Sequence, residues 1–284
     1  MTLLAGIDFS STPRPRKPIT VALARSGQGD VLTLADLLRL PSLAAWSDWL
    51  ATPGPWVGAF DFPFGLPRDF VAQGLGWPLD GERPWAALTR RLAALSRAEL
   101  IAHCRAWCDA RPPGAKFAHR ATDPRAGSSP SMKWINPPVV LMLHEGAPRL
   151  LAAGVSLPGL HTEGADPARV ALEGYPGLLA RAVLGRASYK SDEPARRADP
   201  VRRAARERLI AALETGDHPF TTRIDFGAWR EPCLDDAGAD ALDAVLCLAQ
   251  AGWAWRRRAS GWGLPPDLDA VEGWILGAPH HGSM

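Results

Sequence analysis

The stretch Leu3-Leu4-Ala5-Gly6-Ile7-Asp8 is an apolar run that ends in one carboxylate, a pattern typical of a buried strand. A Pro-rich turn follows at Thr12–Pro18, and then comes the alternating run Ile19–Arg25. The turn residues 27–30 separate that run from a third one, Val31–Leu34. We therefore predict a meander of three strands at the start of the chain.

Further along the chain, a helix and two more strands predict parallel pairing. Leu37–Leu50 has apolar residues at helical spacing, interrupted by Pro41, and the compact apolar run Trp56–Phe60 follows it. A helix between two strands is the usual crossover in a parallel pair. Arg169–Leu172 predicts another short buried strand. The fold class expected is α/β, with a mixed sheet flanked by helices.

The segment Arg68–Asp166 has a different character and is predicted to be a largely helical insertion. Trp85–Cys108 is its clearest amphipathic stretch, and a polar loop is expected over Lys116–Ser131. We expect one domain over residues 1–284 that carries this insertion. After it, helices are predicted over Arg202–Leu213 and Ala237–Trp255, and a closing strand is predicted at Val271–Leu276.

Composition excludes several classes of protein. The 284 residues include 32 Lys and Arg against 30 Asp and Glu, so bulk charge does not predict a nucleic-acid partner. No apolar run approaches the roughly 20 residues of a membrane span. Cys104 and Cys108 are four residues apart, but Cys233 and Cys247 do not form a second ligand pair, so buried thiols are favoured over zinc. Reduced thiols and the absence of a leader-like start indicate a cytoplasmic protein.

Acidic residues recur where predicted strands end. Asp8, Asp61 and Glu173 each follow an apolar run. In an open α/β sheet, ligands bind outside the carboxyl ends of the strands, so these three side chains are expected to converge. A fourth acidic source is the late helix. Its residues Asp236, Asp240 and Asp243 fall within roughly 60° of one another at about 100° per residue.

Such a cluster predicts a divalent-metal site. Carboxylates brought together resist burial unless a cation neutralises them. Oxygen ligands suit Mg²⁺ or Mn²⁺, and a pair of such ions supports phosphodiester hydrolysis in nucleases. The alternative for any single Asp after a strand is a turn or a helix N-cap.

Five short motifs together resemble the DUF429 family of predicted nucleases with a ribonuclease H-like fold. They are Gly6-Ile7-Asp8-Phe9-Ser10-Ser11, Asp61-Phe62-Pro63-Phe64-Gly65-Leu66-Pro67, Glu173-Gly174-Tyr175-Pro176, Asp240-Ala241-Leu242-Asp243-Ala244 and Glu272-Gly273-Trp274-Ile275. The resemblance covers most of the chain except the insertion. It implies a mixed five-stranded sheet whose first strand supplies Asp8, with Asp61, Glu173, Asp240 and Asp243 completing the acidic cluster.

A basic segment follows Glu173. Between Arg181 and Arg208 there are nine Lys or Arg against four acids, a net charge of +5. Such a strip could guide a phosphate backbone, and Lys190 could place a cation at the scissile phosphate. The alternative is a solvated helix face, because Glu207 interleaves with the arginines.

Three functions compete. The first is a metal-dependent hydrolase of DNA or RNA that uses two ions held by Asp8, Asp61, Glu173, Asp240 and Asp243, with Lys190 assisting. The second is a phosphotransferase of the actin-like ATPase and sugar-kinase type, although no duplicated domain or P-loop is visible. The third is a non-catalytic nucleic-acid-binding module on the same fold.

Overall fold

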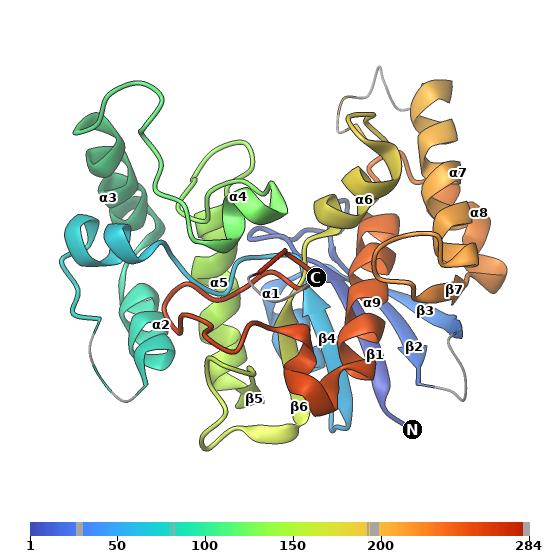
Figure 1. Cartoon of the computed structure of the whole chain (residues 1–284), viewed down its shortest axis with the longest axis horizontal. Helices are drawn as coiled ribbons and strands as arrows, with labels where there is room; N and C mark the ends of the chain where they lie inside the picture. Colours follow the sequence, from blue (N-terminus) through green and yellow to red (C-terminus); the bar gives the residue numbers. More distant parts are fainter. Residues whose placement is uncertain (27–30, 80, 82, 192, 194–198, 281–284) are drawn as a thin grey trace.

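The computed structural model describes residues 1–26, 31–79, 81, 83–191, 193 and 199–280. A mixed sheet runs through it in the order β5-β6-β4-β1-β2-β3-β7 (Figure 1). The strands are β1 (Leu3–Asp8), β2 (Ile19–Arg25), β3 (Val31–Leu40), β4 (Trp56–Phe60), β5 (Val155–Ser156), β6 (Asp166–Glu173) and β7 (Arg223–Asp225). The α/β class is therefore confirmed. The described sheet has seven strands rather than five because the short β5 and β7 extend its two edges.

The predicted meander and the predicted parallel pairing are both present. β1, β2 and β3 pair antiparallel in sequence, whereas β4 pairs parallel with β1 and with β6. The helix predicted from Leu37 was wrong at its start. Leu37 and Leu38 continue β3 opposite Ala22 and Val21, and helix α1 (Leu43–Leu50) begins only after Ser42. The Ser42 side chain accepts from the Ala45 N–H at 3.1 Å and so fixes that start.

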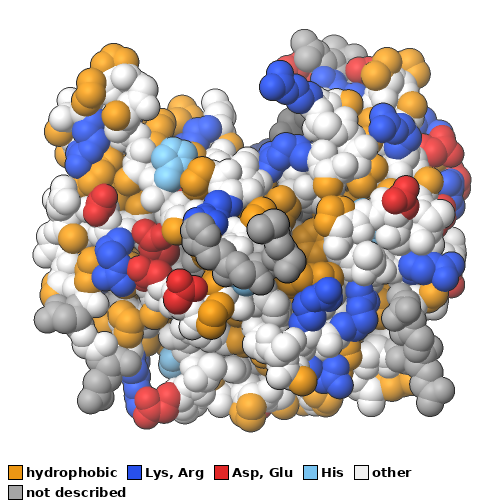
Figure 2. Space-filling view, viewed as in Figure 1, with side chains coloured by type: hydrophobic (Ala, Val, Ile, Leu, Met, Phe, Trp, Pro, Cys, Tyr) orange, Lys and Arg blue, Asp and Glu red, His pale blue; other side chains and the backbone are white. Residues whose placement is uncertain are grey.

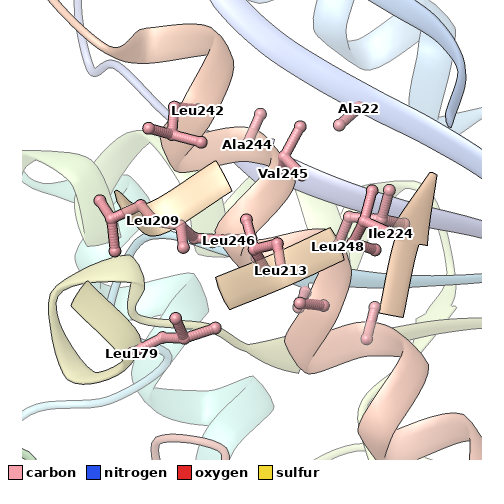
Figure 3. Packing of buried hydrophobic residues seen from close by; sticks show 14 of the residues in the cluster. Ala22, Leu179, Leu209, Leu213, Ile224, Leu242, Ala244, Val245, Leu246 and Leu248 are labelled. Atoms are coloured by element: carbon pink, nitrogen blue, oxygen red, sulfur yellow. The ribbon is translucent and has the colours of Figure 1, made fainter. Parts of the chain in front are cut away.

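Helices cover both faces of the sheet. Along β1, Leu4 faces one hydrophobic cluster while Ala5 and Ile7 face the other, as the period of two requires. The first cluster includes α6 (Pro176–Leu184), α7 (Pro200–Thr215), α8 (Arg230–Asp235) and α9 (Asp240–Arg256). Figure 3 shows the apolar side chains of α9 packed among those of α6, α7 and β7. Helix α9 lies directly against β1.

The second cluster contains α1 and much of the segment 68–166, which is mainly helical as predicted. The helices of this segment are η1 (Phe70–Gly74), α2 (Pro84–Ala94), α3 (Arg97–Asp109), α4 (Thr122–Ala126) and α5 (Val139–Ala152), and of these α4 packs in a third, smaller cluster. The predicted single stretch Trp85–Cys108 is split into α2 and α3. The split lies at Ser96, whose capping box with Glu99 starts a new helix.

The chain ends differently from the prediction. Short 3-10 turns occur at η3 (Gly227–Trp229) and η4 (Arg258–Gly263), and residues 271–276 form turns and loop rather than a closing strand. The Leu276 N–H nevertheless donates to the Glu173 carbonyl at 2.9 Å, so this loop lies at the end of β6. None of the described helices is both long enough and apolar enough to span a bilayer.

Candidate functional site

A close approach between β1 and α9 sets the position of the acidic side chains. A Cβ atom on Gly6 would lie 2.0 Å from the Ala244 carbonyl oxygen and 2.1 Å from the Leu248 nitrogen. Only glycine therefore allows α9 to lie so near the strand. The contact brings the first turn of α9, with Asp240 and Asp243, to the end of β1 where Asp8 lies.

Four of the five predicted acids influence one another electrostatically. Burial raises the pKa of Asp8 well above its ordinary value, and Asp243, Asp240 and Asp61 raise it further. Burial, followed by Asp243, raises the pKa of Asp61 to about 7. Burial and then Asp236 raise the pKa of Asp240. We call Asp8, Asp61, Asp240 and Asp243 the acidic cluster, and we conclude that they lie close enough to disfavour simultaneous ionisation.

The members of the acidic cluster differ in their partners. Asp243 accepts a hydrogen bond from the Tyr189 hydroxyl at 2.5 Å and forms an ion pair with Lys190. The carboxylates of Asp8 and Asp61, in contrast, make no hydrogen bond or ion pair with any described residue, although both are half-buried. Burial disfavours the charge of such a carboxylate, so it takes up a proton or a cation more readily than an exposed one does.

Lys190 brings a positive charge to this site. Its side chain is 47% exposed, but its ammonium end reaches the buried Asp243 carboxylate. Burial disfavours the lysine charge, but Asp243, Tyr189 and Asp8 outweigh this effect and raise the pKa of Lys190. The prediction placed this lysine at the scissile phosphate; the structure places it among the acids.

Arg206 holds the Lys190 segment in place. This arginine belongs to the predicted basic strip, yet it is only 2% exposed. Its Nη1 donates to the Tyr189 carbonyl at 2.9 Å, and its Nε donates to the Leu234 carbonyl at 2.7 Å. Arg206 is therefore a structural anchor, a role that its sequence context did not reveal.

The rest of the basic strip is only partly available to a ligand. Arg202 lies 3.8 Å from Asp199, and Arg203 pairs with Asp235 at 3.0 Å. Arg208 donates to the Val183 carbonyl at 3.3 Å. Arg196 and Arg197 lie outside the described residues. The segment was interpreted either as a strip that guides a phosphate backbone or as a solvated helix face. The partners of Arg202, Arg203 and Arg208 favour the solvated helix face.

The fifth predicted acid, Glu173, has a different environment. Its Oε1 and Oε2 accept from Arg120 Nη2 and Nη1 at 2.7 and 2.8 Å, and Oε2 also accepts from the Phe64 N–H at 2.9 Å. Asp123 holds the other side of Arg120 at 2.9 and 3.0 Å. The Glu272 carbonyl accepts a further bond from Nη1, so all five guanidinium N–H groups are used.

This buried triad of Arg120, Asp123 and Glu173 ties the insertion to β6. Arg120 is 2% exposed and Glu173 is 4% exposed. Glu173 remains near the acidic cluster, because it contributes to the raised pKa of Asp61. Its oxygens, however, are committed to the triad. The sequence contained one signal for the pairing, the i,i+3 spacing of Arg120 and Asp123, but nothing pointed to Glu173.

Asp236 was grouped with Asp240 and Asp243 on one helical face, and this was wrong. It lies before α9, at the end of α8. Its side chain accepts from the Gly238 and Ala241 N–H groups at 3.2 and 3.0 Å. Asp236 therefore satisfies free N–H groups at the start of α9, the capping role that competes with a metal role for any such aspartate.

The donor set fits a hard cation in part. The oxygens of Asp8 and Asp61 have no described partner, and Asp243 would free its Oδ2 once Lys190 moved aside, while its Oδ1 accepts from Tyr189. In the described part of the chain, however, no three Asp, Glu, His or Cys side chains are already arranged to hold a metal ion. The physical reason is visible in the pairing: Lys190 neutralises Asp243, and Arg120 holds Glu173. The four cysteines are all buried free thiols, as expected.

A pocket of about 400 Å³ adjoins the acidic cluster. Asp61, Glu173 and Lys190 are among its lining residues. One wall comes from the insertion and includes Val139 and Met142, and the opposite wall comes from α6 and the chain that follows it. Figure 2 shows the surface hollowed between the arm that carries α3 and the side that carries α6 and α7.

Comparisons of the chain with protein-family models, with curated proteins and with solved structures found no match. The site is therefore interpreted from its own residues.

Proposed function

We propose that this chain is a divalent-metal-dependent nuclease that hydrolyses phosphodiester bonds of DNA or RNA. The observation that carries the proposal is a pair of carboxylates, Asp8 and Asp61, that lie at the adjacent ends of β1 and β4 and have no partner among the described residues. Both have raised pKa values because burial and neighbouring acids disfavour their charge. A divalent cation relieves that repulsion better than a single lysine does.

The residues that would hold Mg²⁺ or Mn²⁺ are Asp8, Asp61 and Asp243, with Asp240 at the edge of the acidic cluster. Such ions supply electrostatic stabilisation of the attacking and leaving oxygens of a phosphodiester. Lys190 is connected to Asp243 and can turn toward a substrate phosphate when a cation takes its place. Glu173 orients the site through the buried triad rather than through free oxygens.

The sheet supports the ribonuclease H-like interpretation. The five longer strands lie in the order β3-β2-β1-β4-β6, with the antiparallel meander on one side of β1 and the parallel strands on the other. Asp8 ends the central strand, which is the place that the resemblance to the DUF429 family assigns to it. The nucleic-acid substrate is proposed because two-metal sites of this kind hydrolyse phosphodiester bonds. The paired arginines of the basic strip add little support for that substrate.

The test is calorimetric titration of Mg²⁺ and Mn²⁺ into the wild type, Asp8→Asn and Asp48→Asn, with hydrolysis of bis(p-nitrophenyl) phosphate measured in parallel. Asp48→Asn is the matched control, because Asp48 is exposed on α1. We expect Asp8→Asn to lose metal binding and metal-dependent hydrolysis while Asp48→Asn retains both. Equal metal binding by the wild type and Asp8→Asn would refute the proposal.

A further inference from the structure

The pocket beside the acidic cluster has the size and character of a small-molecule site. Its volume of about 400 Å³ lies within the range of roughly 300–1,000 Å³ that is usual for ligand pockets. Most of its lining surface is apolar, with contributions from Phe62, Val139, Met142, Ala180 and Ile275. A flat, largely apolar group would be well buried there.

Polar side chains that carry hydrogen-bonding groups also line the pocket. The Arg181 guanidinium lies 5.2 Å from the centre of the Tyr175 ring, and its Nη1 donates to the Tyr175 hydroxyl at 3.3 Å. Arg181 Nη2 donates to the Ala126 carbonyl of the insertion. Ser128 and Ser129 provide hydroxyl groups on the insertion side. This arrangement suits a planar ring with polar edges.

The charged lining residues have different neighbours. Asp61 belongs to the acidic cluster and Lys190 pairs with it, so a phosphate and its metal ions would bind there, whereas Arg181 adds positive charge from α6. The guanidinium of Arg120 also lines the pocket, but all its N–H groups are bound within the triad. A ligand that joins a planar apolar ring to a phosphate matches this order of groups.

We propose that the pocket binds one nucleoside of the substrate, with its base between the insertion and α6 and its phosphate at the acidic cluster. The inference rests on the proposed nuclease function and specifies its substrate. A pocket of this volume admits one nucleotide and no duplex, so the bound base must leave its stack. The preferred substrates are therefore strand ends, single strands or unpaired nucleotides, and intact duplex is cleaved slowly. The insertion serves as one wall of the nucleoside site.

The experiment compares adenosine 5′-monophosphate with ribose 5-phosphate, which has the same phosphate without a base. Binding is measured by calorimetry on the full chain with Mg²⁺ present. We expect the nucleotide to bind at least about tenfold more tightly, because the base buries apolar surface in the pocket. Ala187→Trp, which fills the pocket from an exposed position, should remove that preference.

Ala182→Trp is the matched control, since Ala182 is an exposed residue of α6 that does not line the pocket. It should bind both compounds as the wild type does. Val139→Trp fills the pocket from the opposite wall and serves if Ala187→Trp does not fold. Equal affinity of the wild type for the two compounds, or an unchanged preference in a folded pocket-filling variant, would overturn the inference.

Failure of the nuclease proposal is measured separately. If the wild type hydrolyses bis(p-nitrophenyl) phosphate with metal but shows no preference for the base, the nuclease proposal stands and the nucleoside site is refuted. If that hydrolysis is absent, the nuclease proposal fails whatever the nucleotide binding shows. A third arm compares a single-stranded oligonucleotide with its blunt duplex, and faster cleavage of the duplex would also overturn the inference.

Discussion

Glu173 on β6 and Asp61 after β4 follow the same sequence pattern on neighbouring parallel strands, yet their carboxylates have opposite environments. Glu173 accepts three hydrogen bonds from Arg120 and the Phe64 N–H. Asp61 accepts none from any described residue, and its pKa rises to about 7 because of burial and then Asp243. A paired buried acid holds the fold together, whereas an unpaired one costs stability and is available to a ligand.

The largest effect is expected from breaking the paired side of this comparison. Arg120→Met leaves Asp123 and Glu173 buried without their cation, which should cost about 3–5 kcal/mol of the free energy of unfolding. Urea denaturation followed by circular dichroism measures this loss. Arg105→Met, on the exposed face of α3, should change it by less than about 0.5 kcal/mol.

The combined variant Arg120→Met, Asp123→Asn, Glu173→Gln keeps the comparison testable if Arg120→Met does not fold. With all three charges removed, no unpaired charge remains, and much of the lost stability should return. A combined variant less stable than Arg120→Met alone would show that the triad does not act through charge pairing.

The acidic cluster was largely predictable from sequence, and the triad was not. Asp8 and Asp61 could be placed because the carboxyl ends of parallel strands meet at one edge of a sheet. Arg120 comes from a loop 53 residues before Glu173, and no periodicity links the two positions. Long-range pairing of this kind depends on how the insertion folds back, which local patterns do not encode.

The fold shows the same division. The alternating strand Ile19–Arg25 and the compact apolar strand Trp56–Phe60 matched their predicted bounds. Leu37–Leu40 was assigned to a helix because its leucines fit either period, and pairing with β2 decides the outcome. The edge strands β5 and β7 are only two and three residues long, too short for a period to show.

A smaller effect, visible in its pH dependence, is expected from the unpaired side. The pKa of Asp61 is about 7 in the folded state and about 4 in the unfolded state. Between these two pH values the folded, metal-free protein therefore keeps a proton on Asp61 that the unfolded chain has lost. The contribution of Asp61 to the free energy of unfolding falls as pH rises from about 4 to about 7 and is constant above that. Asp61→Asn carries no such proton.

The stability difference between Asp61→Asn and the wild type should grow in favour of the variant by about 1 kcal/mol per pH unit across that window. Thermal and urea unfolding at pH 4, 5, 6 and 7 without metal measure it. Asp48→Asn, exposed on α1, should show no such trend. A difference that is independent of pH would mean that Asp61 is ionised throughout and has a partner.

The smallest effect is expected at Lys190. This residue combines the paired and the unpaired case, because it pairs with Asp243 and leaves the neighbouring acids of the cluster unpaired. Its ammonium occupies Asp243 and must move before that carboxylate can take a divalent ion. Lys190→Gln removes this competitor and should tighten Mg²⁺ binding by about tenfold, as expected for the loss of one adjacent positive charge. The same variant should cleave oligonucleotides more slowly, because the substrate phosphate loses a cationic contact.

Lys116→Gln, on an exposed loop of the insertion, is the control and should change neither quantity. Weaker Mg²⁺ binding by Lys190→Gln would mean that the lysine positions the acidic side chains to bind the metal ion and does not compete with it. Asp243 would then not be a ligand that Lys190 must first release.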